Sequence, residues 1–95
     1  MKYLILLGFL GITVNASEEL ATRHGCINCH RIEQRAFGPS FKSISDKYKN
    51  DDKAPQNLLK KVRLGGTGSF GSIPMPPQTA PKKDLQEIIK WILSL

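Results

Sequence analysis

The two cysteines of the chain lie three positions apart and are followed at once by a histidine, in the run Cys26-Ile27-Asn28-Cys29-His30. Three residues are close to one helical turn, so both sulfur atoms lie on one side of the segment. The C-x-x-C-H pattern is that of c-type haem attachment, in which each thiol adds across a haem vinyl group. The sequence therefore predicts one haem c, bound through thioethers to Cys26 and Cys29, with His30 as an iron ligand.

Three other uses of these residues are open at this point. A disulfide between Cys26 and Cys29 would close a very small loop and would stabilise the chain little. A thioredoxin-like redox pair requires a βαβ context. A zinc site could combine both thiols with His30 and His24, although the four lie closer together than the ligand pairs of known zinc motifs. His24 is otherwise predicted to be an exposed histidine near a helix C-terminus.

A haem held by one histidine needs a second axial ligand or leaves an open site. Met75 is the one methionine besides Met1, and it stands between Pro74 and Pro76. Prolines restrict the backbone, so such a loop can present the thioether in a fixed place. A core-filling role is the alternative, but no helical stripe surrounds Met75. We therefore predict His30 and Met75 as the two metal ligands, which leaves no position for a substrate and favours electron transfer over catalysis.

The chain is short and poor in apolar residues once its first segment is set aside. Its 95 residues suffice for one domain, and residues 17–95 hold 27 hydrophobic residues, about 34% of that stretch. Chains this short usually need a disulfide, a metal, a cofactor or a partner. We expect the haem to complete the core and the chain without haem to be largely unfolded. The side chains expected against the porphyrin are Phe41, Leu58, Leu59, Val62, Ile73 and Ile92.

The first sixteen residues have the layout of a cleaved secretory signal peptide. A positive start at Lys2 precedes an apolar run over residues 3–14, and small residues follow at the cleavage position after Ala16. A membrane anchor is the alternative, but the run is short against the ~20 residues needed to span a bilayer. The sequence thus predicts a signal peptide over 1–16, a single domain over 17–95, a periplasmic location and no permanent membrane anchor.

The charge balance is basic, with 14 Lys and Arg against 8 Asp and Glu, a formal net charge of +6. Without Lys2 the charge is +5. The basic residues are scattered rather than gathered into an arginine-rich helix, and secretion argues against nucleic acid as a partner. We expect the charge to steer transient encounters with acidic surfaces of redox proteins.

Helical periodicity and capping residues predict an all-α domain of about four helices. Ser17, followed by two glutamates, is expected to cap a helix that reaches about Gly25. Ser40 is expected to cap a second helix, and Pro55 suits the first turn of a third, which Gly65 ends. A last helix begins after Pro81, where Leu85, Ile88, Ile89, Ile92 and Leu93 form an apolar stripe.

The stretch 65–80 contains four glycines and three prolines and is predicted to be a loop. Loops of this length in a small domain are commonly functional. It contains a G-x-G-x-x-G run, Gly66 to Gly71, but that fingerprint requires a preceding strand and a following helix. Here a helix is expected before it and Pro74 and Pro76 come after it, so a dinucleotide site is rejected.

Taken together, the chain resembles a class I cytochrome c of the short, single-haem bacterial type. The resemblance covers residues 17–95 and rests on the Cys26–His30 run, Phe37-Gly38-Pro39, the segment 71–77 and a C-terminal helix with Trp91. It implies a small all-α fold wrapped around haem c, with the N- and C-terminal helices crossing. It also implies that the Pro39 carbonyl accepts a hydrogen bond from the His30 ring, which orients that ligand.

The chain departs from the family pattern at two positions. Phe70 stands where a tryptophan often donates a hydrogen bond to a haem propionate, so Lys61, or Arg63 on the same helix, is expected to compensate. Gln78 stands where an asparagine often donates to the methionine sulfur.

The resemblance implies a soluble, monomeric electron carrier that is not an enzyme. Its donor would be a membrane cytochrome complex and its acceptor a terminal oxidase, reductase or peroxidase. The alternative function is a haem-binding sensor or ligand-exchanging haem protein with a labile sixth site.

Overall fold

The computed structural model describes residues 15–68 and 70–95. These residues form four α-helices and one short 3-10 helix, with one isolated antiparallel bridge between Gly66 and Met75. The all-α prediction is therefore confirmed. In chain order the elements are α1 (Ala16–Arg23), η1 (Cys26–Asn28), α2 (Phe41–Tyr48), α3 (Ala54–Leu64) and α4 (Lys82–Leu93).

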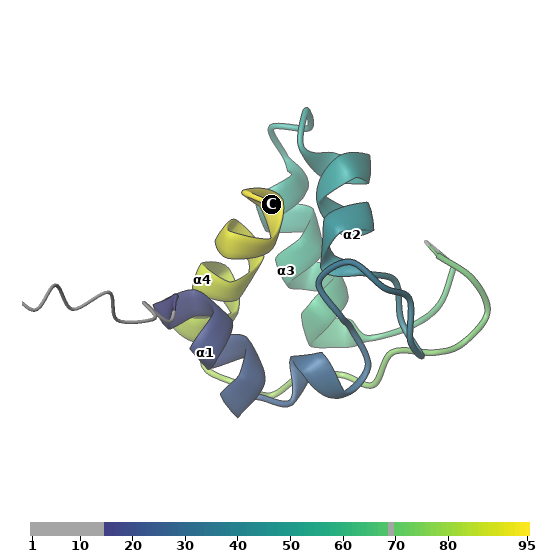
Figure 1. Cartoon of the computed structure of the whole chain (residues 1–95), viewed down its shortest axis with the longest axis horizontal. Coiled ribbons are helices and arrows are strands. Elements are labelled where there is room, and N and C mark those ends of the chain that lie inside the picture. Colours follow the sequence, from purple (N-terminus) through teal and green to yellow (C-terminus); the bar gives the residue numbers. More distant parts are fainter. Residues whose placement is uncertain (1–14, 69) are drawn as a thin grey trace, which may run out of the picture.

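The C-terminal helix α4 is the centre of the fold, and α1, α2 and α3 each contact it (Figure 1). Its apolar residues recur three and four apart, so one face of the helix can be buried along its whole length. The predicted stripe is buried at Leu85, Ile88, Ile89 and Ile92, and Trp91 is buried beside it. Phe41 of α2 meets Trp91 edge to face, with ring centroids 5.4 Å apart.

The first helix begins differently from the prediction. Its N-cap is Asn15, whose side-chain oxygen accepts hydrogen bonds from the backbone N–H groups of Ser17 and Glu18 at 2.8 and 3.4 Å. Ser17, predicted as the cap, lies inside the first turn. Asparagine and serine cap helices about equally well, so two adjacent candidates could not be separated by residue type.

At the other end of α1, His24 is not the exposed histidine that was predicted. Its Nε2 lies 3.0 Å from a carboxylate oxygen of Asp84 on α4, and about a fifth of its side chain is exposed (22%). This contact joins the first and last helices close to the cysteine pair.

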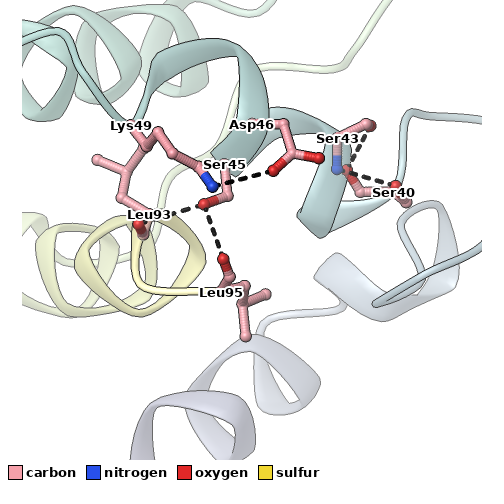
Figure 2. Close-up of polar contacts among 7 residues, drawn as sticks. All are labelled: Ser40, Ser43, Ser45, Asp46, Lys49, Leu93 and Leu95. Atoms are coloured by element: carbon pink, nitrogen blue, oxygen red, sulfur yellow. Dashed lines mark hydrogen bonds and ion pairs between the residues drawn. The ribbon is translucent and has the colours of Figure 1, made fainter.

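The second helix is tied to the C-terminal end of α4 by a buried serine. Ser40 caps α2 as predicted, accepting from the Ser43 N–H at 3.0 Å. Ser45, fully buried, donates its hydroxyl toward the carbonyls of Leu93 and Leu95, both at 3.2 Å (Figure 2). Leu93 is the last residue of α4 and Leu95 follows it, so both oxygens lack helical partners and share the one hydroxyl proton of the serine.

The third helix ends where the sequence predicts, at Gly65, which has φ 69°. A Cβ there would lie 2.5 Å from the Met75 carbonyl oxygen and 2.8 Å from the Pro77 nitrogen. Glycine is therefore required for two reasons, the left-handed backbone and the close return of the loop. The loop leaves α3 at this point and comes back alongside it.

The predicted signal peptide lies almost entirely outside the described residues, since residues 1–14 are not described. Within the described part of the chain, no helix has the length and apolar character needed to cross a membrane.

Candidate functional site

One cavity of about 270 Å³ brings together the two cysteines, both predicted iron ligands and the other predicted cofactor-binding residues. Its lining residues come from η1, from α2, α3 and α4, and from the two long loops, η1 to α2 and α3 to α4. These two loops extend to the same side of the molecule (Figure 1). Its lining is mostly apolar, as expected for a site that takes a large flat organic group. The predicted residues that line it are Cys26, Cys29, His30, Pro39, Lys61, Phe70 and Met75.

The two thiols are presented by η1, a single tight turn. Gly25 enters that turn with φ 78°, and the N–H groups of Cys29 and His30 both donate to the Cys26 carbonyl, at 3.3 and 3.0 Å. Both thiols are free and half-buried. Burial raises the pKa of the Cys26 thiol, against a lowering contribution from a backbone hydrogen bond. The turn therefore offers two sulfur atoms to the same cavity.

The alternatives for the cysteines gain no support from this geometry. The thiols are not joined in a disulfide, and the described residues contain no βαβ unit around them. Across the described residues, no three His, Cys, Asp or Glu side chains are grouped to hold a metal ion. His24 is engaged with Asp84 instead.

The His30 imidazole is held in one orientation by three neighbours. Its Nδ1 lies 2.8 Å from the Pro39 carbonyl oxygen, and because a carbonyl can only accept, the proton is on Nδ1. Its Nε2 then has a free lone pair, which is the form that binds a metal. The ring stacks on Phe41 with centroids 5.5 Å apart and planes 21° apart. Phe41 in turn is fixed by Trp91.

The third neighbour is Gly38, which packs directly on the His30 ring. A Cβ at Gly38 would lie 2.5 Å from Cε1 and 2.8 Å from Nδ1 of His30. We predict that Gly38→Ala displaces the ring, lengthens the His30–Pro39 hydrogen bond and lowers the free energy of unfolding by about 1–3 kcal/mol, the usual range for overpacking. Thermal unfolding and the NMR signals of the His30 ring measure the two effects.

Gly68→Ala is the control for that substitution, because its Cβ would meet no atom within 4 Å. It adds backbone strain at φ 112° without touching His30. Its effect should be confined to stability, with unchanged His30 signals. If Gly38→Ala left both stability and ring signals as in the parent protein, the tight packing on His30 would be refuted.

Met75 is half-buried and lines the same cavity from the loop after α3. Its backbone pairs with Gly66 through two hydrogen bonds, at 2.9 and 3.0 Å. Further along, the Gln78 N–H donates to the Val62 carbonyl at 3.0 Å. The Gln78 side-chain amide donates to the Pro76 carbonyl at 3.0 Å. The thioether is thus carried by a loop that is held at Met75 to Gly66, just after α3, and at Gln78 to α3 itself.

Only one of the two basic residues expected to pair with a haem propionate lines the cavity. Lys61 lines the cavity. Arg63 is not among the lining residues, and its Nη1 donates to the Ala80 carbonyl at 2.7 Å and to the Gln78 carbonyl at 3.4 Å. The position of Arg63 therefore supports a role in holding the loop rather than a charge inside the cavity.

The apolar lining agrees with the prediction except at Leu59. That side chain lies in a separate groove between α3 and α4, beside Pro55 and Ile89. Neighbouring helical residues point about 100° apart, and here Leu58 faces the cavity while Leu59 faces the groove. The other expected side chains line it: Phe41, Leu58, Val62, Ile73 and Ile92.

Among the polar residues at the cavity that sequence reasoning missed are Arg35 and Tyr48. Tyr48 lies in the helix that Ser40 caps, and Arg35 is one of the scattered basic residues. Nothing in local spacing marks either one, because the contacts that bring them to the site come from the loop after α3.

The donor set fits a covalently bound haem. Two thiols on one turn match the two vinyl groups of haem. An imidazole with a free Nε2 and a thioether are both ligands that iron accepts in haem proteins. The remaining lining of the cavity is largely apolar. Iron coordination by nitrogen and by sulfur is thus available from residues on two different loops.

Comparisons of sequence and structure show which known proteins this chain is similar to. A sequence model of the cytochrome c family matches residues 14–95. Cytochrome c-552 of Hydrogenobacter thermophilus is 36% identical over 96 residues, covering 99% of this chain and 97% of that protein. Cytochrome c-551 of Allochromatium vinosum is 40% identical over 77 residues, covering 80% of this chain and 82% of that protein. The crystal structure of Nitrosomonas europaea cytochrome c552 superposes with a TM-score of 0.79 at 38% identity, covering 82% of this chain and 98% of that one.

Proposed function

This chain belongs to the cytochrome c family, and from that premise we propose that it is a periplasmic carrier of single electrons whose iron is ligated by His30 and Met75. Proteins of this family act in electron transfer and bind one covalently attached haem c, and the chain has the Cys-x-x-Cys-His run that attachment requires. One observation carries the proposal: both thiols, the His30 imidazole and the Met75 thioether line a single cavity.

Each residue has a distinct part in this proposal. Cys26 and Cys29 would hold the group through thioethers, and Pro39 would keep His30 in its metal-binding tautomer. When bound, haem c supplies an iron that changes between its ferric and ferrous states by one electron. Ligation of that iron by His30 and Met75 would raise its reduction potential. It would also leave no position for a substrate, so we propose a carrier and not an enzyme.

The exchange of electrons with partners requires the cavity to reach the surface. Phe37 and Ile73 line the cavity and are 69% and 59% exposed. We propose that partners approach there, guided by the net positive charge of the chain. The partners would be acidic surfaces on membrane cytochrome complexes, oxidases, reductases or peroxidases. Such interfaces are small and transient, and they weaken as salt screens the charges.

The proposal is tested on protein matured with a haem-attachment system. We expect the pigment to stay with the polypeptide after denaturation and extraction with acidic organic solvent. The reduced-minus-oxidised spectrum should be that of a six-coordinate haem c. Ferrous protein should bind carbon monoxide slowly or not at all, because Met75 occupies the sixth position.

Two results would contradict the proposal. Haem that is extracted from the denatured chain would exclude thioethers to Cys26 and Cys29. Rapid binding of carbon monoxide to the ferrous protein would instead support a sensor or ligand-exchanging haem protein with a labile sixth site.

A further inference from the structure

The loop that follows the cysteine pair is joined directly to the loop that carries Met75. The Arg35 Nη2 donates to the backbone carbonyl of Phe70 at 3.2 Å, across 35 positions of sequence. Arg35 and Phe70 both line the cavity. The contact therefore links the segment after His30 to the loop of the other proposed ligand, five residues before Met75.

The guanidinium also lies against the backbone of the same loop. Its Nη2 would be 3.5 Å from a Cβ at Gly71, which has φ 135°. The arginine thus lies beside two consecutive residues of the loop. It donates a hydrogen bond to the first, and it borders the space that a side chain at the second would occupy.

The Phe70 ring is held by the end of α2. Tyr48 meets it edge to face with ring centroids 6.4 Å apart. The Lys47 ammonium lies 4.6 Å from the centre of the Phe70 ring, within cation–π range. Phe70 is consequently fixed through its carbonyl by one loop and through its ring by a helix.

The part of the loop that these contacts hold in place is rich in glycine. Gly66, Gly68 and Gly71 all have positive φ, and all three are exposed. Glycine gives the free chain many conformations, so such a stretch has little stability of its own. The Gly66–Met75 hydrogen bonds close its base, and the Arg35–Phe70 contact ties its outer part to the other side of the cavity.

We propose that Arg35 is a positioning residue that, with Phe70, latches the Met75 loop over the cavity. Opening of the loop requires this contact to break, so the rate at which Met75 gives way to another ligand depends on Arg35. The inference rests on the proposed ligation of the iron by Met75. It adds to that proposal what keeps Met75 in place once it is bound.

The test compares two holoprotein variants that each remove one positive charge from the same segment. Arg35→Gln loses the latch, while Arg31→Gln removes an exposed arginine four positions earlier and serves as the matched control. Arg35 is itself exposed, so its variant is expected to fold. Imidazole is the probe, and its binding to the ferric protein is followed by absorbance. We expect Arg35→Gln to bind imidazole about three- to tenfold faster, the factor for one hydrogen bond of this type, with Arg31→Gln unchanged.

A second measurement reports on the loop without depending on the iron. The backbone N–H groups of Gly66, Gly68 and Met75 are hydrogen-bonded within the loop. In Arg35→Gln their hydrogen exchange should accelerate by a similar factor, while that of Ile88 in α4 should not change. A general loss of stability would accelerate all four, so this pattern separates positioning from a merely structural role.

The outcomes distinguish this inference from the function on which it rests. If the ferric parent protein lacks the charge-transfer band of methionine bound to iron, ligation by Met75 is wrong, and the hydrogen exchange data still decide whether the loop is latched. If that band is present and Arg35→Gln matches Arg31→Gln in both measurements, the latch is overturned.

Discussion

Replacing Met75 by alanine is expected to lower the reduction potential by roughly 0.1 V or more, part of the ~0.8 V range that axial ligands span. The thioether favours ferrous over ferric iron, so its loss favours the oxidised state. The iron should also become open to carbon monoxide and imidazole. Potentiometric titration and ligand binding followed by absorbance measure both effects.

Ile73→Ala is the matched control for this substitution. Ile73 lies in the same loop, lines the same cavity and is exposed, but it has no atom that can bind iron. Its removal should leave the sixth position closed to carbon monoxide. An unchanged potential in Met75→Ala, with no binding of exogenous ligand, would show that another group ligates the iron.

Removing both attachment cysteines is expected to abolish the folded state. In a Cys26→Ser, Cys29→Ser double variant the cavity would lack its covalently held group. At ~24 cal/mol per Å³, an unfilled volume of about 270 Å³ corresponds to roughly 6 kcal/mol, similar to the whole net stability of a small domain at ~5–15 kcal/mol. We expect far-UV circular dichroism with little helix and no cooperative thermal transition.

The single variant Cys26→Ser is the comparison for that experiment. One thioether and the His30 ligand remain possible, so part of the chain should mature into a folded, coloured protein. Native-like helix content with a sharp thermal transition in the double variant would contradict a core that depends on haem.

The helices could be predicted where a local signal sets them. Pro55 and Gly65 bracket α3, Ser40 caps α2, and the stripe of α4 is buried as its spacing requires. The start of α1 was wrong because Asn15 and Ser17 are both good caps. The turn η1 was missed, since three residues provide no period to detect.

The residues of the site also differ in whether the sequence alone could identify them. Cys26, Cys29, His30 and Met75 could be singled out because each side chain has a chemistry that few others share, and this needs no knowledge of the fold. Arg35 could not, because an arginine has many uses and its partner is a backbone carbonyl far along the chain. The pairing of His24 with Asp84 escaped for the same reason, since 60 positions separate them.

The packing of α1 on α4 has a consequence for the order in which the molecule is assembled. The chain is synthesised from its N-terminus, so α1 and the two thiols emerge long before α4. The domain cannot close until that last helix arrives to cover the first. The two thiols are therefore accessible while most of the chain is still to come, before α4 can pack on α1. The topology leaves a period in which a group can be joined to Cys26 and Cys29 before the last helix completes the domain.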